Sequence, residues 1–222
     1  MTSIETVGII GGGVSGLSAA GLLTRTGIKV RLFEANGKIG GCCSTTNIGG
    51  YTFNDGVLYL ALPDMLDYVF EKVGLDRKSV LPLKRITAPQ TTVLPNGDKV
   101  TFGDGLRVTV EKKNGTVNEA VLKKELDDMM KRWQPTLRLL TEDILVHPLS
   151  FSRILTKGWR HLPKFGGTVA DELKRLFSDD SVRAAMSGVL LYTGLPPERQ
   201  PTISVLGLVT LFRGWFTNRL TL

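Results

Sequence analysis

The fold is decided by residues 6–35, which read TVGIIGGGVSGLSAAGLLTRTGIKVRLFEA. A short run rich in β-branched residues, Thr6–Ile10, predicts a strand that leads into a glycine-rich turn. The Ala- and Leu-rich segment after that turn predicts a helix that stops at Gly27. A second apolar run, Lys29–Ala35, predicts the next strand, which closes a βαβ unit of about 30 residues. We therefore expect an α/β fold with a Rossmann-like dinucleotide-binding part at residues 1–60.

The turn in this unit carries a glycine pattern. Gly11, Gly13 and Gly16 form G-x-G-x-x-G, and Glu34 follows Gly16 by 18 residues. In this pattern the first glycine permits a tight turn, the second lets the backbone approach a pyrophosphate, and the third allows close helix packing. The anion lies at the helix N-terminus, and the acidic residue accepts hydrogen bonds from ribose hydroxyls. The pattern predicts a dinucleotide site and disfavours NADP, but it does not separate FAD from NAD.

Residues 61–222 are predicted to form a mixed β and helical segment. Apolar residues at helical spacing after a proline predict a helix at Pro63–Leu75. Short β-rich runs separated by Pro, Asn and Gly predict an antiparallel meander over residues 91–110. Helices are expected within residues 118–192, at Asn118–Trp133, Thr168–Phe177 and Asp180–Tyr192, with Pro135 breaking or kinking the first. The segment Asn36–Asn47 is predicted to be a loop.

Composition limits the function classes. The chain has 222 residues, 42% of them hydrophobic and 22% charged, which excludes a wholly disordered, collagenous or coiled-coil protein. Residues up to Glu111 include 11 basic and 10 acidic side chains, and the remainder includes 17 and 11, so most of the net charge of +7 lies in the second half. That excess suggests an anionic partner, although a solvated lysine-rich surface gives the same count.

Targeting signals and disulfides are not expected. No basic region precedes the apolar run at the N-terminus, so we expect no signal peptide. The longest apolar stretch, Ile203–Phe212, is too short for a transmembrane helix, which takes about 20 residues. The only cysteines, Cys42 and Cys43, are adjacent and would form a strained bridge. These features predict a cytoplasmic protein in a reducing compartment.

The sequence begins to resemble a family at Gly40 and Gly41. These glycines lie in ANGKIGGCCST, and GGYTFNDG follows at residues 49–56. The order G-x-G-x-x-G, glutamate, G-G and G-[FY]-x-F-x-x-G is similar to the N-terminus of the FAD-dependent phytoene desaturase and carotenoid isomerase family, which is related to the amine oxidases. LLYTGLPPERQP, at residues 190–201, resembles the stretch after that family's substrate-domain helices. The resemblance thus spans nearly the whole chain.

The resemblance implies FAD as the cofactor, and a hydride removal or isomerisation at C–C bonds of a polyene or other lipophilic substrate. Because the flavin carries this chemistry, we assign no catalytic residue. The cofactor-binding residues that it implies are Gly11, Gly13, Val14, Ser15, Gly16, Glu34, Ala35, Gly40, Gly41 and Cys42. Two departures stand out: Cys42 replaces a common Arg or Lys, and Asn54 and Val57 replace the Asp and Pro of F-D-x-G-P.

Two alternatives stay open. One is an amine oxidase-like flavoprotein that acts on C–N bonds. The other is a non-catalytic or truncated dinucleotide-binding fragment, because the family completes its FAD domain with strands that follow the substrate domain. On that comparison residues 61–222 form a partial substrate domain, and the chain corresponds to the N-terminal half of the family.

Residues 153–164, RILTKGWRHLPK, interleave basic and aromatic side chains. This composition predicts peripheral contact with an anionic membrane, together with the run Ile203–Phe212; the alternative is a helix face that covers a core. No nucleic-acid motif accompanies it, so no nucleic-acid partner is expected. The two histidines, His147 and His161, are isolated from other ligands and predict no metal site. The oligomeric state is left open.

Overall fold

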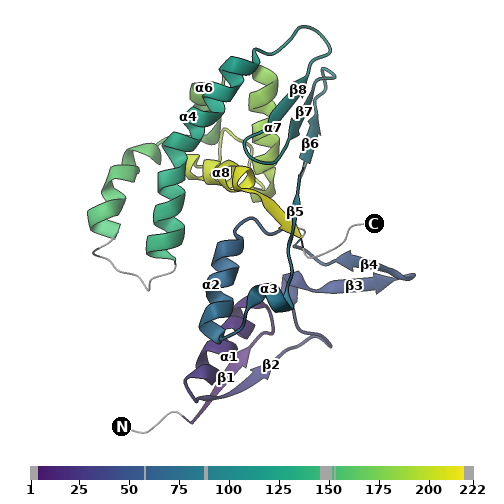
Figure 1. Cartoon of the computed structure of the whole chain (residues 1–222), viewed down its shortest axis with the longest axis vertical. Coiled ribbons are helices and arrows are strands. Elements are labelled where there is room, and N and C mark those ends of the chain that lie inside the picture. Colours follow the sequence, from purple (N-terminus) through teal and green to yellow (C-terminus); the bar gives the residue numbers. More distant parts are fainter. Residues whose placement is uncertain (1–4, 58, 88–89, 146–151, 153, 218–222) are drawn as a thin grey trace. The chain divides into compact units, whose positions relative to one another are not determined.

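A computed structural model describes residues 5–57, 59–87, 90–145, 152 and 154–217 (Figure 1). The chain divides into two compact units: unit 1 comprises Met1–Lys84 with Phe216–Leu222, and unit 2 comprises Arg85–Trp215. The chain passes from one unit to the other within two short strands, β5 (Lys84–Ile86) and β9 (Trp215–Thr217). The sequence analysis placed the dinucleotide-binding part at residues 1–60. The compact units do not test where the cofactor-binding residues end, so this bound stays a prediction.

Unit 1 begins with the expected βαβ unit. Strand β1 (Thr6–Ile10) pairs in parallel with β2 (Lys29–Phe33), so that Thr6 faces Lys29 and Ile10 faces Phe33. Helix α1 (Val14–Arg25) connects them. It stops as predicted, because Gly27 has φ +85° and turns the chain into β2. The predicted α/β, Rossmann-like class is confirmed.

A β-hairpin follows that the sequence analysis missed. The segment Asn36–Asn47 was predicted to be a loop, but β3 starts at Thr45: Thr45–Ile48 (β3) pairs antiparallel with Tyr51–Asn54 (β4). Gly49 and Gly50 join the strands with φ +58° and +83°. A two-residue hairpin turn of type I′ has positive φ at both positions, which explains the glycines. A 3₁₀ turn at Gly41–Cys43 precedes the hairpin.

Two helices complete unit 1. Helix α2 (Pro63–Val73) has its proline in the first turn and ends at Gly74, which has φ +80°. A Cβ on Gly21 of α1 would lie 2.8 Å from Val73 of α2, so the two helices pack through this glycine. Helix α3 (Arg77–Val80) follows. The packing is thin, because all buried hydrophobic side chains among the described residues lie between Val100 and Phe212, in unit 2.

Unit 2 contains the main hydrophobic core. Strands β6 (Gln90–Val93), β7 (Lys99–Phe102) and β8 (Val108–Glu111) form the predicted antiparallel meander, with β7 in the middle. Helix α7 (Asp180–Leu190) packs on β6 and β7, and α6 (Val169–Leu176) and α8 (Leu206–Arg213) pack on α7 (Figure 1). Phe102, Met129, Trp133 and Leu208 are fully buried among these elements.

The long helix α4 (Glu119–Arg138) corrects part of one prediction. Pro135 was expected to break or kink it, and the break is wrong, since α4 continues to Arg138 and passes into a π-helical turn, η2 (Leu139–Ile144). An internal proline costs about 3 kcal/mol in an isolated helix. Trp133 and Leu137 are buried on either side of Pro135, and this packing offsets the cost.

The last elements correct a second prediction. Short helical turns lie at η3 (Ile154–Gly158), η4 (Trp159–Lys164), η5 (Leu191–Thr193) and η6 (Thr202–Val205). The run Ile203–Phe212 was expected to contact a membrane together with residues 153–164. Most of its apolar side chains are instead buried in the core of unit 2, where Val205, Leu208 and Val209 have no exposed surface. In the part of the chain that the structure describes, every helix is too short or too polar to cross a bilayer.

Candidate dinucleotide-binding site

The glycine-rich turn lies at the carboxyl end of β1. The N–H of Gly11 donates to the carbonyl of Phe33 at 2.7 Å, so the turn is attached to the end of β2 as well. Gly11 has φ +100°, which favours glycine. A Cβ on Gly16 would lie 1.9 Å from the carbonyl oxygen of Gly11, so only glycine fits here. Gly11 and Gly16 thus shape the turn itself.

Gly13 differs from these two glycines. Its backbone is extended, with φ −78°, and a Cβ there would meet its nearest heavy atom, Cα of Gly41, at 3.9 Å. Alanine therefore fits this position in the cofactor-free chain. The space over Gly13 stays open for the close approach of a ligand.

Helix α1 begins at this open position. Gly13 is its N-cap and supplies no side-chain hydrogen bond, and the first turn contains no acidic residue. Val14 and Ser15, the first two helical residues, are exposed. Uncapped N–H groups and the positive end of the helix dipole favour an anion at this place. The backbone can therefore bind a phosphate group without a side-chain cation.

Glu34 follows directly after β2 and turns toward the glycines. Its carboxylate accepts hydrogen bonds from the N–H of Gly12 at 2.6 Å and from the backbone N–H and side-chain amide of Asn36, both at 2.9 Å. These bonds, that from the Asn36 backbone first and that from Gly12 next, hold the pKa of Glu34 below its usual value. A carboxylate has about four acceptor positions, and these three hydrogen bonds occupy three of them. Ala35, the next residue, is exposed.

The glycine doublet lies against the same turn. The N–H of Gly40 donates to the carbonyl of Gly12 at 2.8 Å. A Cβ on Gly41 would lie 3.1 Å from Cα of Gly13, so the two backbones approach closely. The structure thus brings the sequence-predicted glycines into one site, although they are separated by more than 20 residues in the sequence.

Cys42 and Cys43 are exposed free cysteines in the 3₁₀ turn after the doublet. The carbonyl of Cys42 accepts the N–H of Val57 at 3.0 Å, which ties this turn to the chain after β4. No group of three or more metal-ligating side chains gathers within the described ranges. Of the two histidines, His147 lies outside those ranges.

A polar cluster beside the doublet was missed by the sequence analysis. Asp55 accepts hydrogen bonds from Lys38 at 2.9 Å, from Thr46 at 2.6 Å and from Ser44. The Ser44 and Thr46 hydroxyls and the Lys38 ammonium lower the pKa of Asp55 to about 2. Lys38 is the cation nearest in sequence to the doublet, and its ammonium is already paired. The D-G dipeptide after a strand could have indicated a turn, but nothing local indicated these partners.

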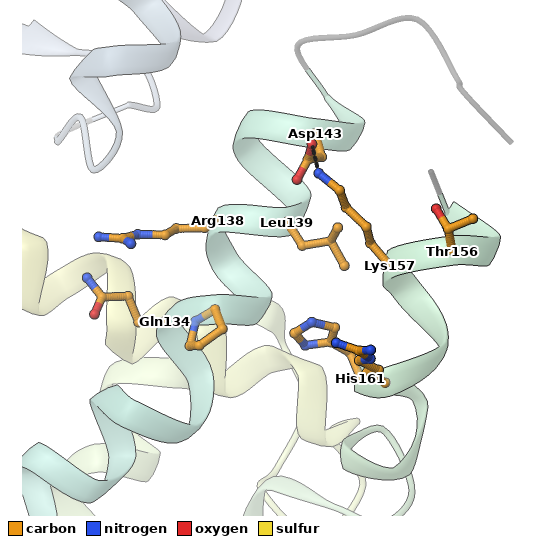
Figure 2. Close-up of a pocket in the computed structure, with 9 residues that line it drawn as sticks. Gln134, Arg138, Leu139, Asp143, Thr156, Lys157 and His161 are labelled. Carbon is orange, nitrogen blue, oxygen red and sulfur yellow. Dashed lines mark hydrogen bonds and ion pairs between the residues drawn. The ribbon is translucent and has the colours of Figure 1, made fainter. Parts of the chain in front are cut away.

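A cavity lies in unit 2, between α4–η2 and η3–η4, with a volume of about 430 Å³ (Figure 2). Leu139 and His161 face each other across it, and Lys157 bonds Asp143 at 2.8 Å at one end. Arg138 extends away from His161 in this view. Burial first, and then Lys164, lowers the pKa of His161. Lys157 is paired with Asp143 and Arg138 points away, so the positively charged side chains do not gather around one point. We therefore assign this cavity no ligand.

The basic segment 153–164 lies partly in this region. Arg153 lies outside the described residues. Lys157 is paired with Asp143, and Lys164 donates to the carbonyl of Arg132 at 2.6 Å, so neither ammonium is free. Arg160 lies over the ring of Trp159. The apolar side chains Leu155, Trp159 and Leu162 are 60%, 58% and 63% exposed.

Comparison with known proteins identifies the relatives of this chain. A family described as NAD(P)-binding Rossmann-like domain matches residues 9–71. A 4,4′-diapophytoene desaturase (4,4′-diaponeurosporene-forming) of Staphylococcus haemolyticus is 26% identical over 94% of this chain and 42% of its own length. The chain is related to the diapophytoene desaturases. A 4,4′-diapolycopen-4-al dehydrogenase of Metabacillus indicus is 28% identical over 89% of this chain and 40% of its own length.

The fold is shared more widely. A solved putrescine oxidase bound to putrescine superposes with a TM-score of 0.53 at 18% identity, covering 90% of this chain and 41% of its own. The chain thus shares its fold with part of this putrescine oxidase, and its sequence is similar to part of the desaturases. It spans about 42% of the length of the curated relatives that it matches.

Proposed function

We propose that this chain binds FAD and takes part in the oxidation or isomerisation of C–C bonds in a polyene or other lipophilic substrate. The observation that carries the proposal is the open space over Gly13 at the uncapped start of α1, beside Glu34 and the doublet Gly40–Gly41. A backbone suited to a phosphate and a carboxylate suited to a ribose therefore lie close together, which supports the proposal.

The residues present fit the ADP half of FAD. The pyrophosphate would lie on the N–H groups of Val14 and Ser15, over Gly13, and a ribose hydroxyl would donate to the remaining acceptor position of Glu34. The negative charge of Glu34 disfavours a 2′-phosphate, which disfavours NADP. When bound, FAD supplies the acceptor for two electrons; the protein positions the cofactor and the substrate.

The substrate class rests on the relatives. Their names describe the desaturation of diapophytoene and the oxidation of diapolycopen-4-al, which are reactions of those proteins. For this chain we infer a lipophilic polyene from the relationship. The rival reaction is the oxidation of C–N bonds. It is supported only by the shared fold with putrescine oxidase.

The test is a titration of the full 222-residue chain with FAD and, separately, with NAD and NADP. We expect FAD to bind with a change in its visible spectrum and with quenched fluorescence, and NADP to bind most weakly. Reduction of the bound flavin by a diapophytoene-type polyene under anaerobic conditions would support the desaturase-like activity, and reduction by an amine alone would support the rival. Flavin binding without reduction by either substrate would favour a non-catalytic dinucleotide-binding part.

We further propose that the exposed apolar side chains Leu155, Trp159 and Leu162 contact a membrane surface, since a lipophilic substrate is supplied from lipid. Of the described cations in this segment, Arg160 is the one without a carboxylate or carbonyl partner, so we expect only a modest dependence on anionic lipid. Vesicle flotation tests this: Trp159→Ser should reduce flotation, and Val93→Ser, at an exposed position on β6, should not. Equal flotation of the wild type and Trp159→Ser would contradict the proposal.

A further inference from the structure

We infer that Asp55 is a positioning residue: its carboxylate holds residues 38–46 so that Gly40 and Gly41 lie against the glycine-rich turn in the geometry that receives the cofactor. This inference rests on the proposed FAD-binding function. Neither the glycine pattern nor the relationship to the desaturases assigns a role to Asp55.

Asp55 directly follows β4 and thus lies at the base of the hairpin that β3 and β4 form. Figure 1 shows this hairpin in unit 1. One carboxylate oxygen accepts Lys38 Nζ at 2.9 Å and the Ser44 hydroxyl, and the other accepts the Thr46 hydroxyl at 2.6 Å. Its backbone N–H donates to the carbonyl of Ser44 at 3.0 Å. One side chain thus connects the start, the middle and the end of the segment that contains the doublet.

The doublet in this segment contacts the glycine-rich turn. Gly40 donates to the carbonyl of Gly12, and Gly41 packs on Gly13. Gly40 and Gly41 have φ +127° and +56°, a conformation that other residues rarely adopt. A segment with several glycines loses much conformational entropy when it is ordered, so it needs contacts that hold it. Asp55 provides such contacts, and it lines the same cavity as Gly41, Ser44 and Thr46.

The hydrogen bonds require a carboxylate rather than an amide. Three donors approach two oxygens, and one donor is an ammonium. An asparagine at this position offers a single acceptor oxygen and no charge, and its NH₂ group would face one of the donors. Because the pKa of Asp55 is about 2, the carboxylate is ionised in any neutral buffer.

The ammonium of Lys38 is held by the same cluster. Its ammonium also donates to the backbone carbonyl of Thr45 and lies 3.3 Å from the Thr46 hydroxyl. The ammonium is therefore directed to the hairpin base rather than to a phosphate. Lys38 thus supports the segment, and the cofactor phosphates depend on the backbone N–H groups at the start of α1.

The test compares Asp55→Asn and Lys38→Met with the control Glu71→Gln in the full chain. Glu71 is an exposed residue of α2 whose side chain forms no hydrogen bond or ion pair within the described residues. Two quantities are measured: amide hydrogen exchange at Gly40 in the cofactor-free protein, and the dissociation constant for FAD. Exchange is compared with that at Ile9 of β1, which reports general unfolding of the unit.

We expect Asp55→Asn to accelerate exchange at Gly40 but not at Ile9, and to weaken FAD binding by about tenfold, the effect of losing one hydrogen bond to a charged group. Lys38→Met should change both quantities in the same direction but less. The double variant should exceed Asp55→Asn by no more than the loss of the Lys38 contacts to Thr45 and Thr46, since the two single changes remove the same ion pair. Glu71→Gln should stay within about twofold of the wild type, which is the range for a surface change without a partner.

The outcomes separate this inference from the proposed function. If the wild type binds no FAD, the proposed function fails, and exchange at Gly40 still decides whether Asp55 orders the segment. If the wild type binds FAD and Asp55→Asn binds it equally well, or exchanges at Gly40 at the same rate, the positioning role is overturned. Should Asp55→Asn fail to fold, Lys38→Met decides by the same two readouts, because it leaves the Ser44 and Thr46 contacts in place.

Discussion

Replacing Gly13 by alanine separates cofactor binding from folding at the candidate site. The backbone at Gly13 is extended, and the new Cβ would have 3.9 Å to its nearest neighbour, so the fold accepts it. Alanine is a poorer N-cap than glycine, but it also reduces the entropy of the unfolded chain by about 0.4–1 kcal/mol, and the two effects oppose each other. We expect the free energy of unfolding to change by less than about 0.5 kcal/mol.

The effect on FAD should be much larger. The methyl group would occupy the space through which a pyrophosphate approaches the backbone. Forcing an extra methyl group into a packed contact costs about 1–3 kcal/mol. Since about 1.4 kcal/mol corresponds to a tenfold change, we expect the dissociation constant for FAD to rise by about 5- to 150-fold.

The assay is a flavin fluorescence titration combined with urea unfolding of the same preparations. Gly27→Ala is the matched control, because Gly27 ends α1 with φ +85° and has no heavy atom within 4 Å of a new Cβ. Alanine in this left-handed conformation costs about 1 kcal/mol, so the control loses stability but keeps its affinity for FAD. Gly13→Ala with unchanged affinity would refute the placement of the pyrophosphate over this residue.

Three further predictions concern the same two units. Gly16→Ala should destabilise unit 1 by more than about 2 kcal/mol in urea unfolding, because the new Cβ would lie 1.9 Å from the Gly11 carbonyl oxygen and the backbone of the turn would have to move. A change below about 0.5 kcal/mol would contradict the turn geometry. The pKa of Glu34 is lowered in the folded state, so its contribution to stability is present above its ordinary value of 4.5 and is lost as the pH falls below it. The difference in unfolding free energy between the wild type and Glu34→Gln should therefore shrink as the pH is lowered from 7 to 3, and a constant difference would refute the role of the charge. Glu172 is 3% exposed and accepts hydrogen bonds from Trp133 Nε1 at 2.8 Å and from Arg132 Nε. Glu172→Gln should therefore lower the free energy of unfolding in urea by about 1–3 kcal/mol. An unchanged unfolding midpoint would show that these contacts do not stabilise unit 2.

The βαβ unit could be predicted because its information is local. The apolar run of β1, the glycines and the Gly27 stop each determine structure within a few residues, and the observed β1, Thr6–Ile10, has the predicted bounds. Helices α6 and α7 were predictable for the same reason, since Thr168 and Asp179 cap them with hydrogen bonds to nearby N–H groups.

The hairpin β3–β4 was harder to predict. Both strands are four residues long, and most of their side chains are exposed, so no alternation of buried and exposed positions marks them. The pair Gly49–Gly50 between two β-forming runs was the available signal. The cluster around Asp55 gave no signal, because its partners lie 9 to 17 residues away in the sequence and meet only when the hairpin forms.

The run Ile203–Phe212 shows a different limit of sequence reasoning. Apolar composition is equally compatible with a membrane surface and with a protein core, and only packing decides between them. In unit 2, Leu208 and Phe212 belong to the same core as Met129 and Trp133, so the run is internal. By contrast, Trp159 is 58% exposed, and membrane contact through residues 153–164 stays a proposal.

The central claim is that the glycine-rich turn, Glu34 and the glycine doublet together bind FAD. The most direct test is an equilibrium titration of the full chain with FAD, followed by competition with ADP and with 2′-phosphorylated ADP. The proposal predicts one FAD per chain, displaced by ADP and far less by its 2′-phosphorylated form. A chain that folds, with the hydrogen-exchange protection of the β1–β2 pair intact, and yet binds no FAD would contradict it.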